Sequence, residues 1–297
     1  MLGCLAITAC GPLAHKTSNM KHRLGVCSWS LRTEELETLA ARICETGVRF
    51  VQLGLDPVVQ GDWQIADVRR AFDAAGVVIL SGMMGTKGED YSTLETIRET
   101  GGIRPTEHWP ANLAAARACA QVAQDLGLDL VSFHAGFLPH DHADPERAVL
   151  IDRVQQVADV FAERDVRLAF ETGQETAETL LGVLDEIDRK NVGVNFDPAN
   201  MILYGMGEPA LALRTLGGHV LQVHVKDATP CAVPGTWGDE VPVGTGAVDW
   251  SAFFAVLDEQ GLACDLMIER EAGDERVRDM RTARELLEEL QVVEEKR

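Results

Sequence analysis

The sequence predicts a single α/β domain folded as a (β/α)8 barrel, with eight parallel strands inside a ring of helices. Along its 297 residues, short apolar segments alternate with longer amphipathic ones. The apolar segments lack an alternating polar face, as expected for strands that are buried on both sides. Several helical segments end at a glycine just before a strand, where a left-handed cap is easiest for glycine. These glycines are Gly47, Gly76, Gly127 and Gly261.

The elements can be placed in order from these patterns. Segments rich in Val, Leu, Ile and Phe predict strands at residues 24–28, 50–53, 77–81, 130–133, 167–170, 192–196, 220–225 and 266–268. Apolar residues at spacings of three and four predict helices at 34–45, 65–75, 111–126, 146–164, 176–189, 209–216, 251–260 and 274–290. An open doubly wound sheet is disfavoured, because the turn after the first strand (residues 27–31) has no Gly-x-Gly-x-x-Gly pattern.

The barrel is expected to occupy residues 24–297, after a leader at residues 1–23. Residues 7–10 (ITAC) resemble a lipoprotein cleavage box at Cys10, but no Lys or Arg precedes it and the apolar stretch is short. Met20, just before the first strand, is a natural start for a cytoplasmic protein. We therefore expect a disordered or misassigned leader and a cytoplasmic protein, with an exported lipoprotein anchored at Cys10 as the alternative. No apolar run is long enough to span a bilayer.

Composition limits the partners. The 27 Lys and Arg residues against 47 Asp and Glu give a net charge of −20, which argues against nucleic acid and anionic membranes as partners. The seven cysteines contain no Cys-x-x-Cys pair, so unpaired thiols in a reducing compartment are expected. A small-molecule substrate fits this composition best. A homo-oligomer paired through the outer helices is compatible with it, although no surface stripe identifies an interface.

The most informative residues follow the predicted strands. Catalytic groups of such barrels project from the carboxyl ends of the strands, and several apolar strands here end in a metal-ligating residue type. A buried, isolated carboxylate is costly without a partner, so a cation is the best explanation for a group of them at one end of the barrel. The residues are His134, Glu171, Asp197, His224 and Glu269.

Each of these residues also has an ordinary structural interpretation. A single Asp or Glu at a strand end is often a helix cap or a salt-bridge partner, and a single His is often only hydrogen-bonded. Their recurrence on strands five to eight favours a metal site at Glu171, Asp197, His224 and Glu269. Three carboxylates and one imidazole favour one divalent ion, manganese, magnesium or cobalt, with zinc as the alternative.

Two long connections are candidates for binding loops. Residues 82–109 carry Tyr91, Arg104 and His108, and we interpret this segment as a lid rather than a surface excursion. The second connection, residues 227–249, contains Gly244-x-Gly246, a weak signal for a phosphate-binding turn.

Four segments at these strand ends carry a family resemblance. They are FETGQE (170–175), NFDPAN (195–200), VHVKD (223–227) and IERE (268–271). In this order they resemble the xylose-isomerase-like sugar phosphate isomerase/epimerase superfamily, over most of the chain from Leu24 onward. The resemblance implies a TIM barrel whose metal is held by Glu171, Asp197, His224 and Glu269. It further implies that Glu171 and Glu269 are the catalytic acid/base pair, as in the D-tagatose 3-epimerase branch. That branch has a histidine three residues after the metal-binding aspartate, where this chain has Asn200.

The constellation predicts carbohydrate chemistry by proton transfer. A divalent ion that coordinates a carbonyl and a neighbouring hydroxyl acidifies the C–H between them and stabilises the enediolate. Two carboxylates could then move the proton between faces of one carbon, which is epimerisation, or between adjacent carbons, which is isomerisation. Expected contacts to substrate or to the ligands are His134, Gln174, Asn200, Lys226 and Trp29.

Two of these contacts have open alternatives. Lys226 could neutralise the intermediate or pair with Asp227, and Trp29 could be a sugar-facing wall or an ordinary core aromatic. Glu271 is a substitute ligand if the register of the last strand is shifted by two, and Arg270 with Glu271 could form an ion pair outside the site.

Three other functions compete with an isomerase or epimerase. An inosose-type dehydratase would use the same site and differ only in its product. A DNA-repair endonuclease would need more histidines and a basic groove, which this acidic chain lacks. A non-catalytic, metal-containing sugar-binding barrel is the third, because fold alone does not establish a reaction.

Overall fold

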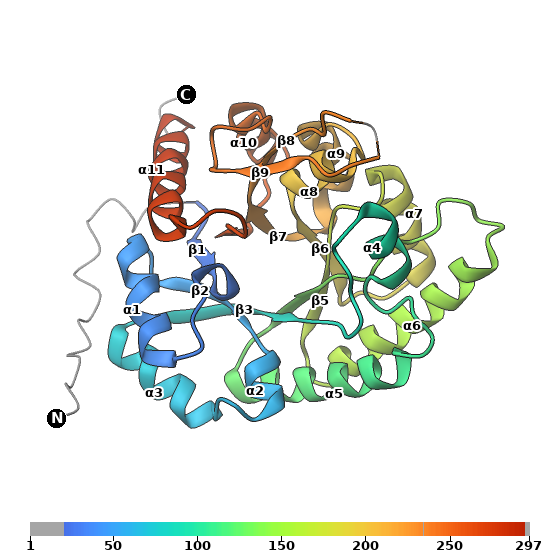
Figure 1. Ribbon diagram of the computed structural model, residues 1–297, viewed down its shortest axis with the longest axis horizontal. Coiled ribbons are helices and arrows are strands. Elements are labelled where there is room, and N and C mark those ends of the chain that lie inside the picture. The colour runs from blue at the N-terminus through green and yellow to red at the C-terminus, as the bar shows by residue number, and fades with distance from the viewer. Residues whose placement is uncertain (1–20, 234, 295–297) are drawn as a thin grey trace.

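The computed structural model describes residues 21–233 and 235–294, and within them the chain forms a closed barrel of eight parallel strands (Figure 1). The strands lie in the order β1-β10-β7-β6-β5-β4-β3-β2, and β2 pairs with β1 to close the ring. The predicted fold is confirmed, with each predicted strand within a few residues of its place. The strands are β1 (Leu24–Cys27), β2 (Phe50–Gly54), β3 (Val78–Met84), β4 (Leu130–Phe133), β5 (Arg167–Glu171), β6 (Val192–Phe196), β7 (Val220–Val225) and β10 (Asp265–Ile268).

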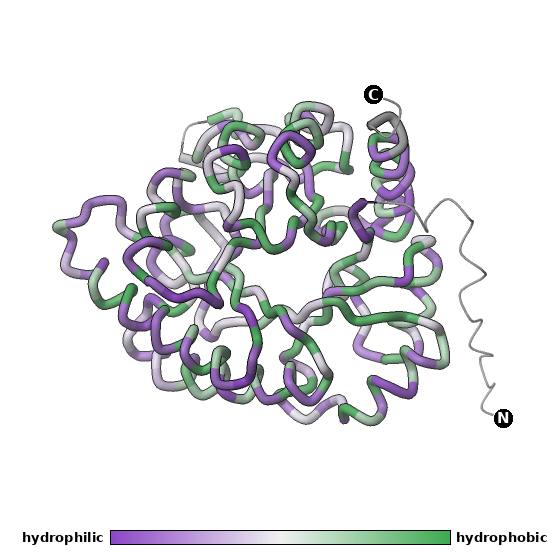
Figure 2. Tube along the Cα trace, turned by 180° about the vertical axis from the view of Figure 1, so that it is seen from behind, coloured by the Kyte–Doolittle hydropathy of each residue, from purple (hydrophilic) through white to green (hydrophobic). Residues whose placement is uncertain are grey.

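The expected helices surround this barrel and bury their apolar faces against it. Figure 2 shows largely hydrophobic segments toward the centre and mixed segments in the outer ring. Gly47, Gly76 and Gly127 cap three helices in the left-handed conformation, as the sequence predicted. The helices are α1 (Leu36–Thr46), α3 (Ile65–Ala75), α5 (Trp109–Leu126), α6 (Pro145–Ala162), α7 (Ala177–Ile187), α9 (Pro209–Leu216), α10 (Trp250–Glu259) and α11 (Arg276–Glu294).

Several short elements were not predicted, and all but one occupy connections at the carboxyl ends of the strands; the exception is the 3-10 turn that directly precedes β7. A small antiparallel hairpin follows β7 in the connection to α10. Because the functional side chains of a barrel gather at this end, several of these elements contribute residues to the walls of the candidate site. They are α2 (Asp56–Gln60), α4 (Leu94–Thr100), α8 (Pro198–Tyr204), the hairpin strands β8 (Asp227–Thr229) and β9 (Asp239–Val241), and the 3-10 turns η2 (Ser28–Leu31) and η3 (Gly217–His219).

The long connection after β3 is fixed at its base. Gly102 has φ +64°, and a Cβ placed on it would lie 2.2 Å from the carbonyl oxygen of Ala135 in the connection after β4. The Ile103 amide donates to the same carbonyl oxygen at 3.1 Å. The side-chain amide of Asn112, on α5, donates to the carbonyl oxygen of Gly102 at 3.3 Å. Only the first part of the connection lines the candidate cavity, through Gly85, Thr86, Glu89 and Tyr91. The lid interpretation therefore concerns only this part of the connection.

Residues just before the first strand already pack against the rest of the domain. His22 is buried, and its Nδ1 lies 2.9 Å from the carbonyl oxygen of Cys264, while Arg23 makes a two-pronged ion pair with Asp265 at 2.6 and 2.7 Å. The lipoprotein-like box with Cys10, and the rest of the expected leader up to Met20, lie outside the described residues.

Two composition-based expectations can be compared with the described residues. None of the helices described there is both long and apolar enough to cross a bilayer. Cys27, Cys119, Cys231 and Cys264 are free, as expected. Cys44 is disulfide-bonded, so the expectation of unpaired thiols is wrong for that residue.

Candidate metal centre and active site

Four of the residues singled out in the sequence meet at one end of the barrel. Glu171, Asp197, His224 and Glu269 lie at the carboxyl ends of β5, β6, β7 and β10, which are consecutive neighbours in the barrel. One ligand atom from each lies within 4.8 Å of the ligand atoms of the others, and all four residues are buried. The folding of four adjacent strands is therefore sufficient to assemble this cluster.

The cluster contains one unsatisfied polar atom from each of its four residues. Basic side chains lie near two of these atoms, with Lys226 Nζ 3.1 Å from Oε2 of Glu269 and His134 Nε2 3.5 Å from Oε2 of Glu171. None of the four buried atoms forms a hydrogen bond, however: Oε2 of Glu171, Oδ2 of Asp197, Nδ1 of His224 and Oε2 of Glu269. Buried polar atoms are nearly always satisfied in folded proteins, so four exceptions side by side need an explanation. Three oxygens and one imidazole nitrogen are a donor set that suits a divalent cation. The residues present thus fit a metal ion.

The second carboxylate oxygen of both glutamates is held by a donor. The side-chain amide of Asn200 donates to Oε1 of Glu171 at 3.0 Å, and the indole N–H of Trp29 donates to Oε1 of Glu269 at 2.7 Å. These bonds orient the carboxylates through Oε1 and leave Oε2 of each without a hydrogen bond. Trp29 therefore does more than fill the core, because it also holds a candidate catalytic group.

Asp197 is both a helix cap and a candidate metal ligand, the two roles that the sequence suggests for a carboxylate at a strand end. Its Oδ1 accepts the backbone N–H groups of Ala199 and Asn200 at 2.8 and 3.0 Å and caps α8. Its Oδ2 is the unsatisfied atom of the cluster. One carboxylate thus serves as a helix cap through one oxygen and as a candidate ligand through the other.

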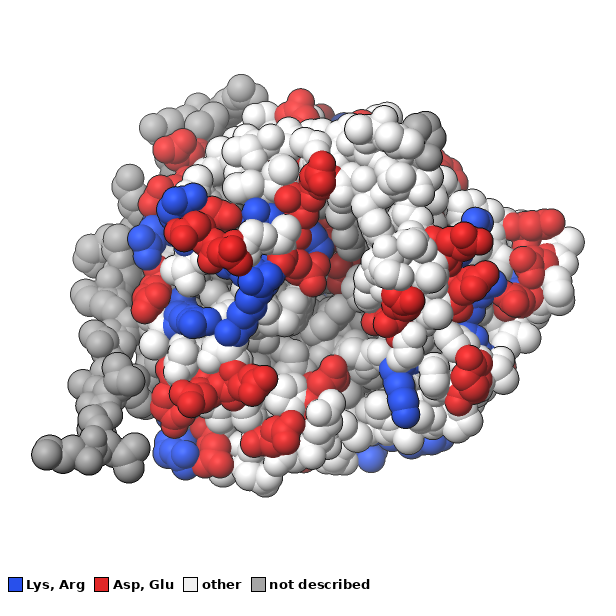
Figure 3. All heavy atoms as spheres, viewed as in Figure 1, with Lys and Arg blue, Asp and Glu red and all other residues white. Residues whose placement is uncertain are grey.

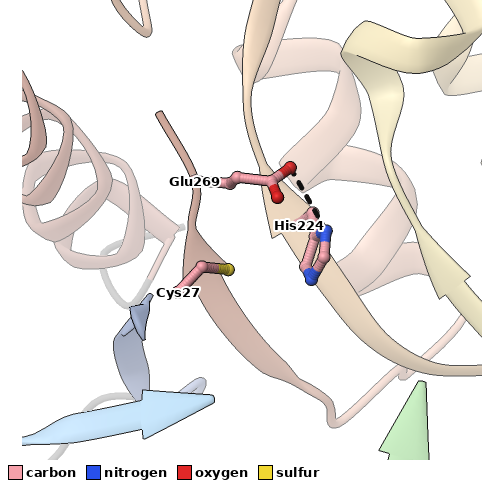
Figure 4. A group of neighbouring side chains, drawn as sticks. All are labelled: Cys27, His224 and Glu269. Carbon is pink, nitrogen blue, oxygen red and sulfur yellow. Dashed lines mark ion pairs between the residues drawn. The ribbon is translucent and has the colours of Figure 1, made fainter. Parts of the chain in front are cut away.

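His224 is the nitrogen donor of the cluster. Its Nδ1 lies 3.3 Å from Oε1 of Glu171 and 3.4 Å from Oε2 of Glu269, and Figure 4 shows the ring beside Glu269 and Cys27. Cys27, His224 and Glu269 also meet the spacing for a metal site. Burial raises the pKa of the Cys27 thiol to about 12, and a protonated thiol is a poor ligand. The four-residue set is therefore the better candidate.

Lys226 is surrounded by carboxylates, but Asp227 is not one of them. Its Nζ lies 2.6 Å from Glu271, 3.1 Å from Glu269 and 3.8 Å from Asp197. The suggested Lys226–Asp227 pair is wrong, because consecutive residues in an extended chain point to opposite sides. The suggested Arg270–Glu271 pair is also wrong, because the Arg270 guanidinium pairs with Glu240 at 2.7 Å and with Asp279 at 3.1 Å. Glu271 is also half exposed and outside the four-residue cluster.

Asp227 fills the turn that the sequence weakly marked for phosphate. Its Oδ2 accepts the backbone N–H groups of Gly244 and Gly246 at 2.9 and 3.2 Å. The same oxygen accepts the indole N–H of Trp250 at 3.2 Å. The amides that would hold a phosphate are thus already bonded to a buried carboxylate, and the Gly-x-Gly expectation is not supported.

The charges of the cluster depend on burial and on nearby cations. Burial raises the pKa of Asp197 to about 8. Burial also opposes ionisation of Glu171 and Glu269, but His134 holds the pKa of Glu171 below its usual value, and Lys226 does the same for Glu269. The two glutamates are thus charged even without a metal ion. A bound metal ion would favour the charged form of Asp197 as well.

A cavity of about 570 Å³ opens beside the cluster, and most of the predicted contact residues line it. They are Trp29, His134, Asn200 and Lys226. Gln174 does not: it lines two smaller cavities, to which Tyr204 also contributes. Figure 3 shows a hollow near the middle of this view, with acidic groups at its rim. The sequence did not single out several other lining residues, namely Asp56, Tyr204, Trp237 and Glu240. The last two belong to the candidate binding loop 227–249, but its only motif, Gly244-x-Gly246, lies elsewhere in the loop.

Glu175 is a buried acid that stands apart from the four-residue cluster, and it predicts a pH effect on stability. Burial raises its pKa to about 8 from an ordinary 4.5, and its Oε1 accepts the Leu138 N–H at 2.7 Å. Between these two pH values the folded protein keeps a proton that the unfolded chain has released, so stability falls as pH rises. Glu175→Gln resembles the protonated acid and should remove this contribution.

We therefore expect the metal-free Glu175→Gln variant to gain stability relative to wild type as pH rises from 5 to 8. The measurement is the free energy of unfolding by denaturant at several pH values for both proteins. All other groups titrate in both and cancel in the difference. Parallel curves over this range would show that Glu175 is ionised in the folded protein.

Comparisons with known proteins agree with the fold. The family model described as xylose isomerase-like TIM barrel matches residues 39–290. A search of curated proteins finds no match. Among solved structures, the xylose isomerase domain protein from Planctomyces limnophilus is similar at 32% identity, over 91% of this chain and 97% of that one, with a TM-score of 0.82.

Two more distant structures share the fold and contain ligands. A D-allulose 3-epimerase from Methylomonas sp. in complex with D-allulose is 16% identical, over 91% of this chain and 97% of that one, with a TM-score of 0.69. A xylose isomerase-like TIM barrel protein from Mycobacterium smegmatis in complex with magnesium is 17% identical, over 94% and 98%, also with a TM-score of 0.69. At these identities the likeness is one of fold.

Proposed function

Because the chain belongs to the xylose isomerase-like TIM-barrel family, we propose that it is a divalent-metal-dependent enzyme that epimerises or isomerises a small sugar or polyol. The single observation that carries this proposal is the set of four unsatisfied atoms, one from each of Glu171, Asp197, His224 and Glu269. A cation among them would satisfy all four at once. Magnesium, manganese and cobalt suit the oxygen-rich set best, with zinc as the alternative.

The proposed reaction depends on the two glutamates. When bound, a divalent ion polarises a carbonyl and lowers the pKa of the neighbouring C–H. Glu171 and Glu269 belong to β5 and β10, and β6 and β7 lie between these strands. The two carboxylates therefore approach the cluster from different sides. One would remove the proton and the other would return it, which inverts a carbon centre or moves the carbonyl to the next carbon.

Other residues of the chain would hold these carboxylates and the substrate. Asn200 and Trp29 fix Oε1 of each glutamate, so that Oε2 is the atom available for proton transfer. His134 lies with Nε2 at 3.5 Å from Oε2 of Glu171 and lines the cavity, which suits a contact to a sugar hydroxyl.

The charges around the cavity favour an uncharged substrate without a phosphate group. Among the described residues, Lys226 is the only Lys or Arg side chain that lines the cavity, and it already contacts three carboxylates. The glycine turn that could hold phosphate is bonded to Asp227. Glu89 and Glu240 add negative charge to the lining, while four aromatic side chains offer apolar faces for sugar C–H groups. A free sugar or polyol fits these walls better than a sugar phosphate does.

The proposal predicts metal uptake together with exchange of a sugar C–H. We expect the purified wild-type protein to bind about one divalent ion per chain, as four protein ligands around one ion imply. With that ion it should exchange deuterium from D2O into a ketose, aldose or inosose, detected by proton NMR. The same spectra separate the products: an epimer or isomer supports this proposal, whereas loss of water gives the dehydratase.

Matched sugars and sugar phosphates should be screened side by side with and without the metal. Metal binding without exchange in any of them would favour the non-catalytic sugar-binding barrel. Failure to bind manganese, magnesium, cobalt or zinc would contradict the proposed function. Turnover of a sugar phosphate in preference to the free sugar would contradict the proposed substrate class only.

A further inference from the structure

A layer of fully buried polar side chains lies inside the barrel and touches the metal centre at one point. These side chains come from five strands and bond to one another across the barrel, as buried polar groups must. Only one of them, Gln52 on β2, bonds to a residue of the four-residue cluster among the described contacts: its Oε1 lies 2.6 Å from Nε2 of His224. The layer comprises Gln52, Ser81, Ser132, Asn195 and Gln222.

The neighbours of Gln52 fix the orientation of its amide. Its Nε2 lies 3.2 Å from the carbonyl oxygen of Gly82 and 2.7 Å from the hydroxyl oxygen of Ser132. A backbone carbonyl can only accept, so the NH2 group must face it. The Ser132 hydroxyl donates in turn to the sulfur of Met83 at 3.0 Å, which leaves its oxygen free to accept. The carbonyl oxygen of Gln52 therefore faces His224.

This orientation determines which ring nitrogen of His224 carries the proton. An amide oxygen is only an acceptor, so Nε2 of His224 must be the donor in the 2.6 Å bond. In the neutral ring, Nδ1 then has the free lone pair. Nδ1 is also the unsatisfied nitrogen of the cluster. Gln52 thus acts on the side of the ring away from the candidate metal.

We propose that Gln52 is a positioning residue that locks the tautomer and orientation of His224 so that Nδ1 is a metal ligand. The inference rests on the proposed function, in which a metal occupies the cluster. Hydrogen bonds to the far nitrogen of a ligating histidine commonly contribute 10–100-fold in metal affinity. In most such sites a carboxylate or a backbone carbonyl accepts this bond, and here a side-chain amide held by two further bonds does so.

The test compares zinc affinity among three variants, measured by competition with a chelator of known affinity. Gln52→Met removes the acceptor with little change in volume, and we expect about 10–100-fold weaker zinc binding. Gln222→Met is the matched control: Gln222 is equally buried in the same layer, but it bonds to Ser81 and Asn195 rather than to His224. Its affinity should stay close to that of wild type. Gln52→Glu keeps an acceptor for the His224 N–H, and its zinc affinity should therefore be close to that of wild type.

A second readout follows the tautomer itself. In the wild-type protein with ¹⁵N-labelled histidine and zinc bound, the ring N–H of His224 should be at Nε2, with Nδ1 carrying the metal. This NMR measurement uses only the wild-type protein, so it tests the inference even if Gln52→Met fails to fold. A ring N–H at Nδ1 would overturn the inference, as would equal zinc affinities for Gln52→Met and Gln222→Met. Wild-type protein that binds no metal would overturn both this inference and the proposed function.

Discussion

Replacing Glu171 with glutamine is expected to lower kcat by about 10²–10⁴-fold, the usual contribution of a general acid or base. The glutamine keeps the size of the side chain and an acceptor for the Asn200 amide, which donates to Oε1 at 3.0 Å. It replaces Oε2, the oxygen without a hydrogen bond, with an NH2 group that cannot accept a proton. Glu269→Gln should have an effect of similar size. The measurement is the turnover of the sugar identified by deuterium exchange, at saturating metal concentration.

Glu175→Gln is the matched control for this experiment. Glu175 is a buried glutamate only four residues away, outside the four-residue cluster. Because burial raises its pKa to about 8, it is largely protonated near pH 7, and a glutamine resembles it there. Its kcat should remain close to that of wild type. Unchanged turnover in both Glu171→Gln and Glu269→Gln would refute the proposed acid/base roles, even if the metal site itself is correct.

Asp197→Asn should separate the two tasks of Asp197. The amide oxygen can still accept the N–H groups of Ala199 and Asn200 that Oδ1 caps. The NH2 group then takes the place of Oδ2, the unsatisfied oxygen of the cluster, and an NH2 group is not a metal ligand. We expect metal affinity, measured by titration calorimetry, to fall by more than about 100-fold, since even changes outside the ligand set cost 10–100-fold.

The same substitution should not destabilise the metal-free protein. Burial raises the pKa of Asp197 to about 8, which means that burying this ionisable carboxyl group destabilises the wild-type fold. Burying the uncharged amide of asparagine does not carry this cost. Asp144→Asn is the control, because Asp144 caps α6 in the same way, with Oδ1 accepting the Glu146 N–H at 2.9 Å. It should leave metal affinity unchanged. Wild-type affinity in Asp197→Asn would mean that Asp197 is a helix cap alone.

The barrel was predictable because its strands and longer helices have strong periodic patterns. Elements of three to seven residues were missed: α2, α4 and α8 are at most two turns long, too short for a helical repeat to be recognised. The hairpin of β8 and β9 has three-residue strands joined by a nine-residue connection, 230–238, without a tight-turn signal. Of these missed elements, α2, α8 and β9 contribute residues to the walls of the cavity. The sequence therefore predicted the barrel that supports the site better than it predicted the cavity walls.

The four clustered residues were predictable because the ends of adjacent parallel strands must lie together. Gln52 was not, because one polar residue in the apolar segment FVQLG reads as a side chain on the outer face of a strand. Only the closed barrel reveals that it points inward and reaches His224, 172 residues away in the sequence. The wrong pairings of Lys226 with Asp227 and of Arg270 with Glu271 came from judging proximity by sequence neighbours rather than by strand geometry.

The way in which the connection after β3 is attached bears on how such a protein can diverge. Its base is joined to the connection after β4 through main-chain atoms of Gly102, Ile103 and Ala135, while Tyr91 reaches the cavity. Main-chain hydrogen bonds survive most side-chain replacements, provided that the glycine is kept. After gene duplication, substitutions around Tyr91 can therefore change the substrate specificity while the barrel stays intact. We expect homologous enzymes with different substrates to differ first in this segment and last at Gly102.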